Sequence, residues 1–266
     1  MKPLLFVVLV CTALLPRSVN AKMTCTVVLD MDTATVLHRQ GACDKRLTPA
    51  STFKVALALI GFESGYLVST DAPEMPFKEG YPDWRGDLWR QNITPKTWIE
   101  YSVVWYSQLI TRAIGKETIT EYLQKFSYGN ADFSGDAGYD NALERAWIAS
   151  SLKISADDQI HFLHRMLTHQ LPVSAQAVRL TTSLIEKTTA ENGWIVHGKT
   201  GLAFPRRADR SFDRDRAIGW FVGWAEKDDR RVVFAKVIQD ELEQEQTPSN
   251  RARNSLLREL PTLIAP

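Results

Sequence analysis

The sequence predicts an α/β (α+β) fold in which a mostly antiparallel sheet is flanked by helices and carries a helical subdomain. Stretches with strand character lie near both ends of the chain, at residues 25–43 and 193–240, whereas residues 94–190 predict mainly helices and connecting loops. Strands from both ends favour one sheet with a helical insertion at about residues 90–190. The 266 residues, 44% of them hydrophobic, can bury one sizeable core.

The first 21 residues have the pattern of a secretory signal peptide. Lys2 precedes an apolar run over residues 4–15, and small residues at Val19 and Ala21 favour cleavage after Ala21. The apolar run is shorter than the roughly 20 residues that a membrane span needs, and no later stretch reaches that length. We therefore expect residues 22–266 to form a single exported, periplasmic domain that does not insert into the membrane.

Two strands joined by a turn at about residues 32–35 are predicted between Cys25 and Cys43. Antiparallel pairing around that turn places the two cysteines opposite each other to within about one residue. In an oxidising compartment they can form a disulfide, but two separate thiols in a sheet fit the sequence equally well.

A helix is expected over about residues 49–63, with Thr48 as its N-cap, Pro49 at its first position and Gly65 just after its end. Further helices are expected at residues 94–115 (capped by Thr94, with Pro95 following), 115–126, 155–171 (from Ser155) and 249–260. Further strands are expected at residues 193–201, 216–227 and 230–240.

Ser51 and Lys54 are three positions apart and so share one face near the start of the first helix. A serine there has backbone N–H groups and the positive end of the helix dipole beside it, which favour a developing oxyanion. Lys54 faces the apolar run at residues 55–62, and burial there pushes the lysine toward the neutral amine that can accept a proton. The pair predicts a nucleophilic serine with a lysine base, although a lysine that merely extends from a buried helix gives the same local pattern.

Two later motifs favour the catalytic interpretation. Ser102-Val103-Val104 follows in the middle of the chain, and Lys199-Thr200-Gly201 ends a predicted strand. Each triplet is weak alone, but the order S-x-x-K, S-x-V, K-T-G at this spacing is typical of penicillin-recognising serine enzymes. The middle element is S-V-V here, in place of the S-D-N of other members of that group.

The sequence resembles the class D serine β-lactamases, the oxacillinases, over nearly the whole chain after the signal peptide. The matching stretches are STFK at 51–54, SVV at 102–104, YGN at 128–130, WIASSLKIS from Trp147, KTG at 199–201 and GWFVGW at 219–224. The resemblance implies the serine β-lactamase and penicillin-binding transpeptidase-like fold. It also implies antibiotic resistance through hydrolysis of penicillin-type β-lactams by an acyl-enzyme on Ser51.

The same resemblance implies that carbon dioxide carboxylates the Nζ atom of Lys54, and that the resulting carbamate is the general base. No separate cofactor is expected. Trp147 would donate its indole N–H to the carbamate. Ser102 would relay a proton toward the leaving nitrogen, with Lys199 adding positive potential beside it. Apolar lining is assigned to Phe53, Val104 and Leu152, and a site-shaping role to Tyr128 and Asn130.

Substrate binding is implied for Val104, Thr200, Gly201, Leu202 and Arg253. The backbone N–H groups of Ser51 and Leu202 would form the oxyanion hole. Thr200 and an arginine of the terminal helix would bind the carboxylate of the β-lactam. The pattern R-x-x-[I/L] favours Arg253 for this arginine, but Arg251 also fits.

Other ligand classes are not expected. The 32 basic and 31 acidic residues nearly balance, so no global field favours nucleic acid. The arginine-rich stretch at residues 206–216 is interleaved with aspartates and predicts a solvated hairpin tip. His161, His164 and His169 lie on one predicted helix or its end without a metal-binding motif, so no metal site is expected.

Two alternatives to a β-lactamase remain at the level of the sequence. A non-hydrolysing β-lactam sensor domain would normally follow transmembrane helices, and a penicillin-binding transpeptidase would more often show S-x-N and a membrane anchor. Sustained turnover separates both of them from a hydrolase. No pattern in the sequence indicates an oligomeric state.

Overall fold

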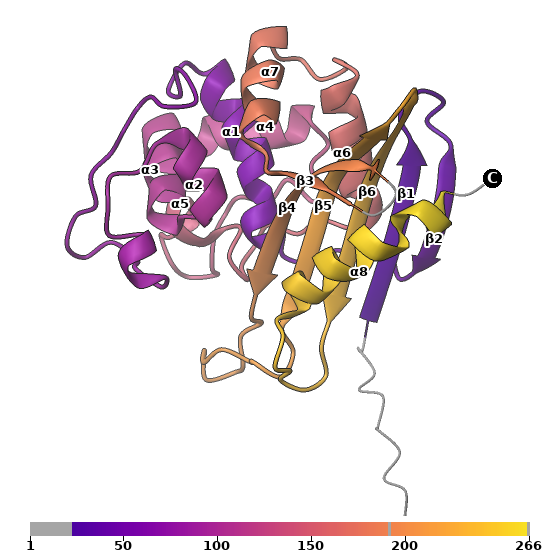
Figure 1. Ribbon diagram of the computed structural model, residues 1–266. Coiled ribbons are helices and arrows are strands. Elements are labelled where there is room, and N and C mark those ends of the chain that lie inside the picture. Colours follow the sequence, from indigo (N-terminus) through magenta and orange to yellow (C-terminus); the bar gives the residue numbers. More distant parts are fainter. Residues whose placement is uncertain (1–22, 191–192, 265–266) are drawn as a thin grey trace, which may run out of the picture.

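The computed structural model describes residues 23–190 and 193–264, and it contains one six-stranded sheet (Figure 1). The predicted signal peptide lies outside the described residues. The strands are β1 (Met23–Asp30), β2 (Val36–Gly41), β3 (Lys187–Thr189), β4 (Ile195–Ala203), β5 (Ile218–Lys227) and β6 (Arg230–Gln239). They run antiparallel in the order β2-β1-β6-β5-β4-β3, so the strands from the two ends of the chain meet where β1 pairs with β6. This arrangement confirms the predicted fold class.

Helices cover both faces of the sheet (Figure 1). They are α1 (Phe53–Glu63), α2 (Pro95–Tyr101), α3 (Val104–Ile114), α4 (Lys116–Lys125), α5 (Ala142–Arg145), α6 (Ala156–Leu167), α7 (Ala175–Leu184) and α8 (Pro248–Leu263). Short 3₁₀ turns are η1 (Ala50–Thr52) and η2 (Gly86–Leu88). Among the described helices, none is both long enough and apolar enough to cross a membrane.

Alternating strand residues divide the core into two clusters. Val27 of β1 and Val233 of β6 belong to the larger cluster, which contains α1 and the other internal helices. Val28 and Phe234, their neighbours in sequence, pack with α8 on the opposite face. Successive side chains of a strand point to opposite faces, so the sheet separates the terminal helix from the helical part of the molecule.

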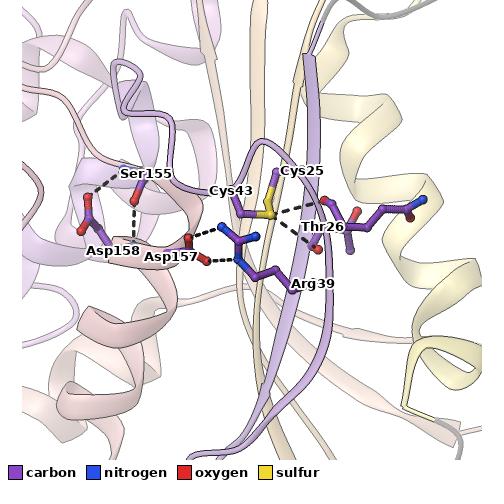
Figure 2. The surroundings of a disulfide bond; sticks show 8 residues. Cys25, Thr26, Arg39, Cys43, Ser155, Asp157 and Asp158 are labelled. Atoms are coloured by element: carbon purple, nitrogen blue, oxygen red, sulfur yellow. Dashed lines mark hydrogen bonds and ion pairs between the residues drawn. A yellow bond between two sulfur atoms is a disulfide. The ribbon is translucent and has the colours of Figure 1, made fainter.

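The N-terminal hairpin is closed by a disulfide between Cys25 and Cys43, whose Cα atoms are 5.1 Å apart (Figure 2). Of the two states that the sequence left open, the structure therefore contains the disulfide. Gly41, opposite Cys25 in the hairpin, has a φ of +91°, and a Cβ there would lie only 2.0 Å from the carbonyl oxygen of Thr24. Only glycine fits this turn, which brings Cys43 back onto β1.

The beginning of the first helix differs from the prediction. The α-helix begins at Phe53, and the preceding residues form the 3₁₀ turn η1. Thr48 does not cap this helix, because its hydroxyl oxygen accepts from the backbone N–H of Ala149 at 3.0 Å and its O–H donates to the carbonyl oxygen of Trp147 at 2.9 Å. A long-range contact thus replaces the local cap, while the end of the helix at Glu63, shortly before Gly65, agrees with the prediction.

The helix expected over residues 94–115 is two helices, α2 and α3, which meet at Ser102 and Val103. The predicted start is correct, because Thr94 caps α2 through a reciprocal pair of hydrogen bonds with Thr97. Ser102 has φ +58° and ψ +40°, the left-handed conformation that ends a helix. The apolar periodicity continues through this break, which is why the pattern did not reveal it.

Three smaller differences concern element ends. The helix from Ser155 ends at Leu167 rather than at residue 171, and His169 follows it with a positive φ. The edge strand β3 was not predicted; its three residues pair with β4. K-T-G lies within β4, which continues to Ala203, rather than at the end of the strand.

Candidate active site

The segment before Ser51 is held in place by contacts from two distant parts of the chain. The indole N–H of Trp220 in β5 donates to the carbonyl oxygen of Thr48 at 2.9 Å. The Thr48 hydroxyl and the backbone N–H of Ala50 both donate to the carbonyl oxygen of Trp147, at 2.9 and 3.1 Å. The turn η1 therefore presents Ser51 from a backbone that is anchored on both sides.

Ser51 and Lys54 meet as their spacing predicts. The Nζ atom of Lys54 lies 3.2 Å from the Oγ atom of Ser51, and the Lys54 side chain is completely buried. Burial, and secondarily the charge of Lys199, lowers the pKa of the Lys54 amine well below its ordinary value. A neutral amine beside a serine hydroxyl can accept its proton, so the pair has the geometry of a nucleophile with its base.

Ser102 and Lys199 form a second serine–lysine pair. The Nζ atom of Lys199 donates to the Oγ atom of Ser102 and to the carbonyl oxygen of Thr200, both at 3.2 Å. The left-handed conformation of Ser102 places its hydroxyl at the gap between α2 and α3. Burial lowers the pKa of Lys199 to about 8, with Glu186 opposing and Arg85 adding to this shift.

Gly201 brings β4 against η1. A Cβ at this position would lie 2.9 Å from the carbonyl oxygen of Pro49 and 3.2 Å from the backbone nitrogen of Thr52. Only a residue without a side chain allows this approach of the K-T-G strand to the Ser51 turn. Ser51, Lys54, Ser102 and Lys199, all predicted as catalytic, are thereby brought into one site.

Trp147 is buried beside the first turn of α1. Its ring lies 5.5 Å from that of Phe53, the residue before Lys54, and 6.1 Å from the ring of Phe133. The other residues assigned to the apolar lining, Val104 and Leu152, are buried as well. The structure thus places the indole against the residue that precedes Lys54, and its role toward a carbamate stays a prediction.

Tyr128 and Asn130 support the chain after Trp147. Asn130 accepts from the backbone N–H of Lys153 and donates to the carbonyl oxygen of Ser151, both at 2.9 Å. The buried Tyr128 ring packs 6.0 Å from that of Phe53. Asn130 therefore fixes the segment at residues 151–153 and Tyr128 packs against the start of α1, while the site-shaping role that the resemblance implied stays a prediction.

The two candidate arginines of α8 have different partners. Arg251 forms an ion pair with the buried carboxylate of Asp240, which follows β6. Arg253 donates to the hydroxyl of Thr188 in β3 at 3.0 Å and lies 3.5 Å from a carboxylate oxygen of Glu186. Arg253 therefore reaches the sheet edge beside β4, whereas Arg251 is held at the opposite side of β5.

Thr200 and Leu202 lie on the α8 face of β4. Thr200 pairs with Phe221, which packs against α8, and Leu202 pairs with Gly219, where a Cβ would meet the backbone of Ser249 in α8. Lys199 and Gly201 point to the other face, as alternation along a strand requires. Thr200 and Arg253 consequently belong to the same side of the sheet.

Two charged residues near Lys199 were missed by the sequence analysis. Glu186, immediately before β3, and Arg85, on the loop before η2, shift the pKa of Lys199 in opposite directions. Arg85 also donates to the carbonyl oxygen of Tyr101, the residue before Ser102, at 3.3 Å. Neither residue belongs to a local motif, and only pairing between distant segments brings them to the site.

Comparison with known proteins connects this geometry to a family. The model of the penicillin-binding protein transpeptidase domain matches residues 18–261. β-Lactamase OXA-9 of Klebsiella pneumoniae is 40% identical over 242 residues, which cover 91% of this chain and 88% of OXA-9. The regulatory protein BlaR1 of Bacillus licheniformis is 30% identical over 77% of this chain but only 31% of its own length.

A solved structure agrees with the sequence relatives. The crystal structure of OXA-427, a class D β-lactamase, superposes with a TM-score of 0.82 at 41% identity, covering 90% of this chain and 97% of that one. Sequence similarity, the shared fold and the two serine–lysine pairs lead to the same assignment. The chain therefore belongs to the class D β-lactamase family.

Proposed function

We propose that this protein hydrolyses the β-lactam ring of penicillin-type antibiotics through an acyl-enzyme on Ser51, and so confers resistance to them. The observation that carries the proposal is the 3.2 Å contact between the Ser51 hydroxyl and the fully buried amine of Lys54. The Oγ atom bonds to the lactam carbonyl carbon, the ring C–N bond breaks, and water later cleaves the ester to release the open product.

The base in both steps is Lys54 carboxylated on Nζ. A neutral amine and carbon dioxide combine to form a carbamate with release of one proton, and the lowered pKa of Lys54 keeps its amine in the reactive form. The carbamate accepts the proton of Ser51 during acylation and that of the attacking water during deacylation. The indole of Trp147, packed against Phe53, is the proposed hydrogen-bond donor to the carbamate.

The second serine–lysine pair, Ser102 and Lys199, acts on the leaving nitrogen of the lactam. Ser102 passes a proton to it while the Lys199 ammonium, 3.2 Å from the Ser102 hydroxyl, supplies positive potential. Thr200 and Arg253 bind the substrate carboxylate, and the backbone N–H groups of Ser51 and Leu202 bind the developing oxyanion. Arg253 is favoured over Arg251 because Arg251 is already paired with the buried Asp240.

Export to the periplasm is part of the proposal. The signal-like segment at residues 1–21 supports export. The disulfide between Cys25 and Cys43 also fits an oxidising compartment. A hydrolase in that compartment meets β-lactams before they reach the enzymes of cell-wall synthesis.

The test is steady hydrolysis of a chromogenic β-lactam by the purified chain, in buffer depleted of carbon dioxide and in the same buffer with bicarbonate. Sustained turnover that rises with bicarbonate supports the hydrolase and the carbamate together. Sustained turnover at the same rate in both buffers would contradict the carbamate but not the hydrolase. A single stoichiometric burst of β-lactam cleavage in both buffers would instead indicate a sensor, and the similarity to the regulatory protein BlaR1 makes this alternative worth testing.

A further inference from the structure

Glu186 lies where the chain leaves α7 and enters the edge strand β3. Its carbonyl oxygen accepts a hydrogen bond from the backbone N–H of Gly198 at 3.2 Å, so its backbone is beside the residue that precedes Lys199. The Glu186 side chain is 65% exposed and extends toward α8, where its carboxylate pairs with Arg253.

The pair between Glu186 and Arg253 has the properties of an exchangeable contact. The shortest distance between its charged atoms is 3.5 Å, and water reaches the carboxylate. Such exposed pairs contribute little because solvent screens them. Arg251 offers the contrast, because its partner Asp240 is buried and a separated Asp240 would be a buried, unpaired charge. Of the two arginines, only Arg253 can readily exchange its carboxylate.

The same carboxylate also acts on Lys199. Four charged groups act on this site: Lys54 from α1, Arg85 from the loop before η2, Glu186 from the residue before β3, and Arg253 from α8 through its contact with Glu186. Among the described residues, Glu186 is the one that raises the pKa of Lys199. A single exposed glutamate therefore offsets the positive charge that the proposed function uses to bind an anionic substrate.

We propose that Glu186 is an internal substitute for the substrate carboxylate: it occupies Arg253 in the free enzyme, and the carboxylate of an incoming β-lactam displaces it. This inference rests on the proposed function and adds a residue that sets selectivity by charge. Displaced from Arg253, Glu186 still lies beside the site and continues to weaken the binding of anions. A substrate without the carboxylate has no such competitor.

The test compares the wild type with Glu186→Gln, which keeps the shape of the side chain and removes its charge. The measured quantity is the second-order rate constant of acylation of Ser51, followed by mass spectrometry, for a β-lactam acid and for its uncharged methyl ester. At about pH 6, where Lys199 remains charged in both proteins, we expect the acid to react about two- to five-fold faster with E186Q. The ester should react equally with both. Glu117→Gln, an exposed charge change on α4, is the matched control and should change neither rate.

A second readout separates the electrostatic role from a structural one. Removing the Glu186 charge lowers the pKa of Lys199, so the alkaline decline of the acylation rate should begin at lower pH in E186Q than in the wild type. Equal rates with the acid, or an equal gain with acid and ester, would overturn the inference. Because acylation does not require turnover, a protein that acylates without hydrolysis would contradict the proposed hydrolase while still testing Glu186.

Discussion

The Nζ atom of Lys199 lies 3.2 Å from the Oγ atom of Ser102, and this contact joins the K-T-G strand to the gap between α2 and α3. Ser102 has a left-handed backbone, a conformation that non-glycine residues rarely adopt and that costs about 1 kcal/mol or more. The strain is local to the residue whose hydroxyl faces the lysine. Backbone conformation and hydroxyl position at Ser102 are thus linked, and two substitutions can separate them.

Ser102→Gly and Ser102→Ala should both lower acylation by about 10²-fold or more, because both remove the hydroxyl that relays the proton. Their stabilities should differ. Glycine tolerates the positive φ, so S102G should have a free energy of unfolding about 1 kcal/mol above that of S102A. Denaturant unfolding and acylation rates measure the two effects. An acylation rate of S102G equal to that of the wild type would show that the Ser102 hydroxyl takes no part in acylation.

Lys199→Met should stabilise the fold at neutral pH while reducing acylation. The pKa of Lys199 is lowered from 10.5 to about 8, so the unfolded chain binds more protons between these values and the stability of the wild type rises with pH across this window. Below about pH 8 the folded protein carries the full penalty of a buried ammonium. K199M removes this penalty, so its free energy of unfolding should exceed that of the wild type by about 1–3 kcal/mol below pH 8. The advantage of K199M in denaturant unfolding should shrink toward pH 10; a constant difference would contradict the shifted pKa.

The acylation rate of the wild type should decline as the pH rises through about 8. The Lys199 ammonium loses its proton in this range, and with it the positive potential beside the leaving nitrogen. Acylation rates measured from pH 6 to 10 check this alkaline decline. A rate that stays level to pH 10 would exclude a charged Lys199 from the acylation step.

Gly201→Ala should damage the site through the backbone. Its Cβ would lie 2.9 Å from the carbonyl oxygen of Pro49 and 3.2 Å from the backbone nitrogen of Thr52, and these two backbone atoms cannot turn away as a flexible side chain can. We expect β4 to shift from the Ser51 turn, with about tenfold or greater loss of acylation and a loss of about 1–3 kcal/mol in unfolding free energy. An acylation rate and an unfolding free energy equal to those of the wild type would show that β4 can move away from the Ser51 turn without effect.

Arg253→Ala and Arg251→Ala should have opposite consequences. R253A removes the proposed carboxylate binder and should raise KM for a β-lactam acid more than it changes kcat or stability. R251A leaves the carboxylate of Asp240 buried without its partner and should destabilise the protein by about 3–5 kcal/mol, with KM of the folded enzyme nearly unchanged. KM and denaturant unfolding together check the pair. The reverse pattern would assign the carboxylate to Arg251.

Several features of this protein were determined by the sequence alone because they depend on neighbours within one or two turns of chain. The three-residue spacing of Ser51 and Lys54 places them on one helix face whatever surrounds them. Thr94 and Ser155 cap their helices through residues three positions later. The strand content of the two ends of the chain also predicted the sheet, since strands satisfy their backbone N–H and C=O groups by pairing with one another.

Other features were decided only by tertiary structure. Thr48 is of a residue type that often caps the N-terminus of a helix, yet its hydroxyl hydrogen-bonds to the carbonyl oxygen of Trp147. Ser102 interrupts an apolar period that continues on both sides, and its hydroxyl accepts a hydrogen bond from Lys199 of the distant strand β4. Glu186 and Arg253 are 67 positions apart in the chain and meet only when β3 joins the sheet edge and α8 packs across it. Local spacing carries no information about such pairs, because their proximity arises from the packing of helices and loops against the sheet.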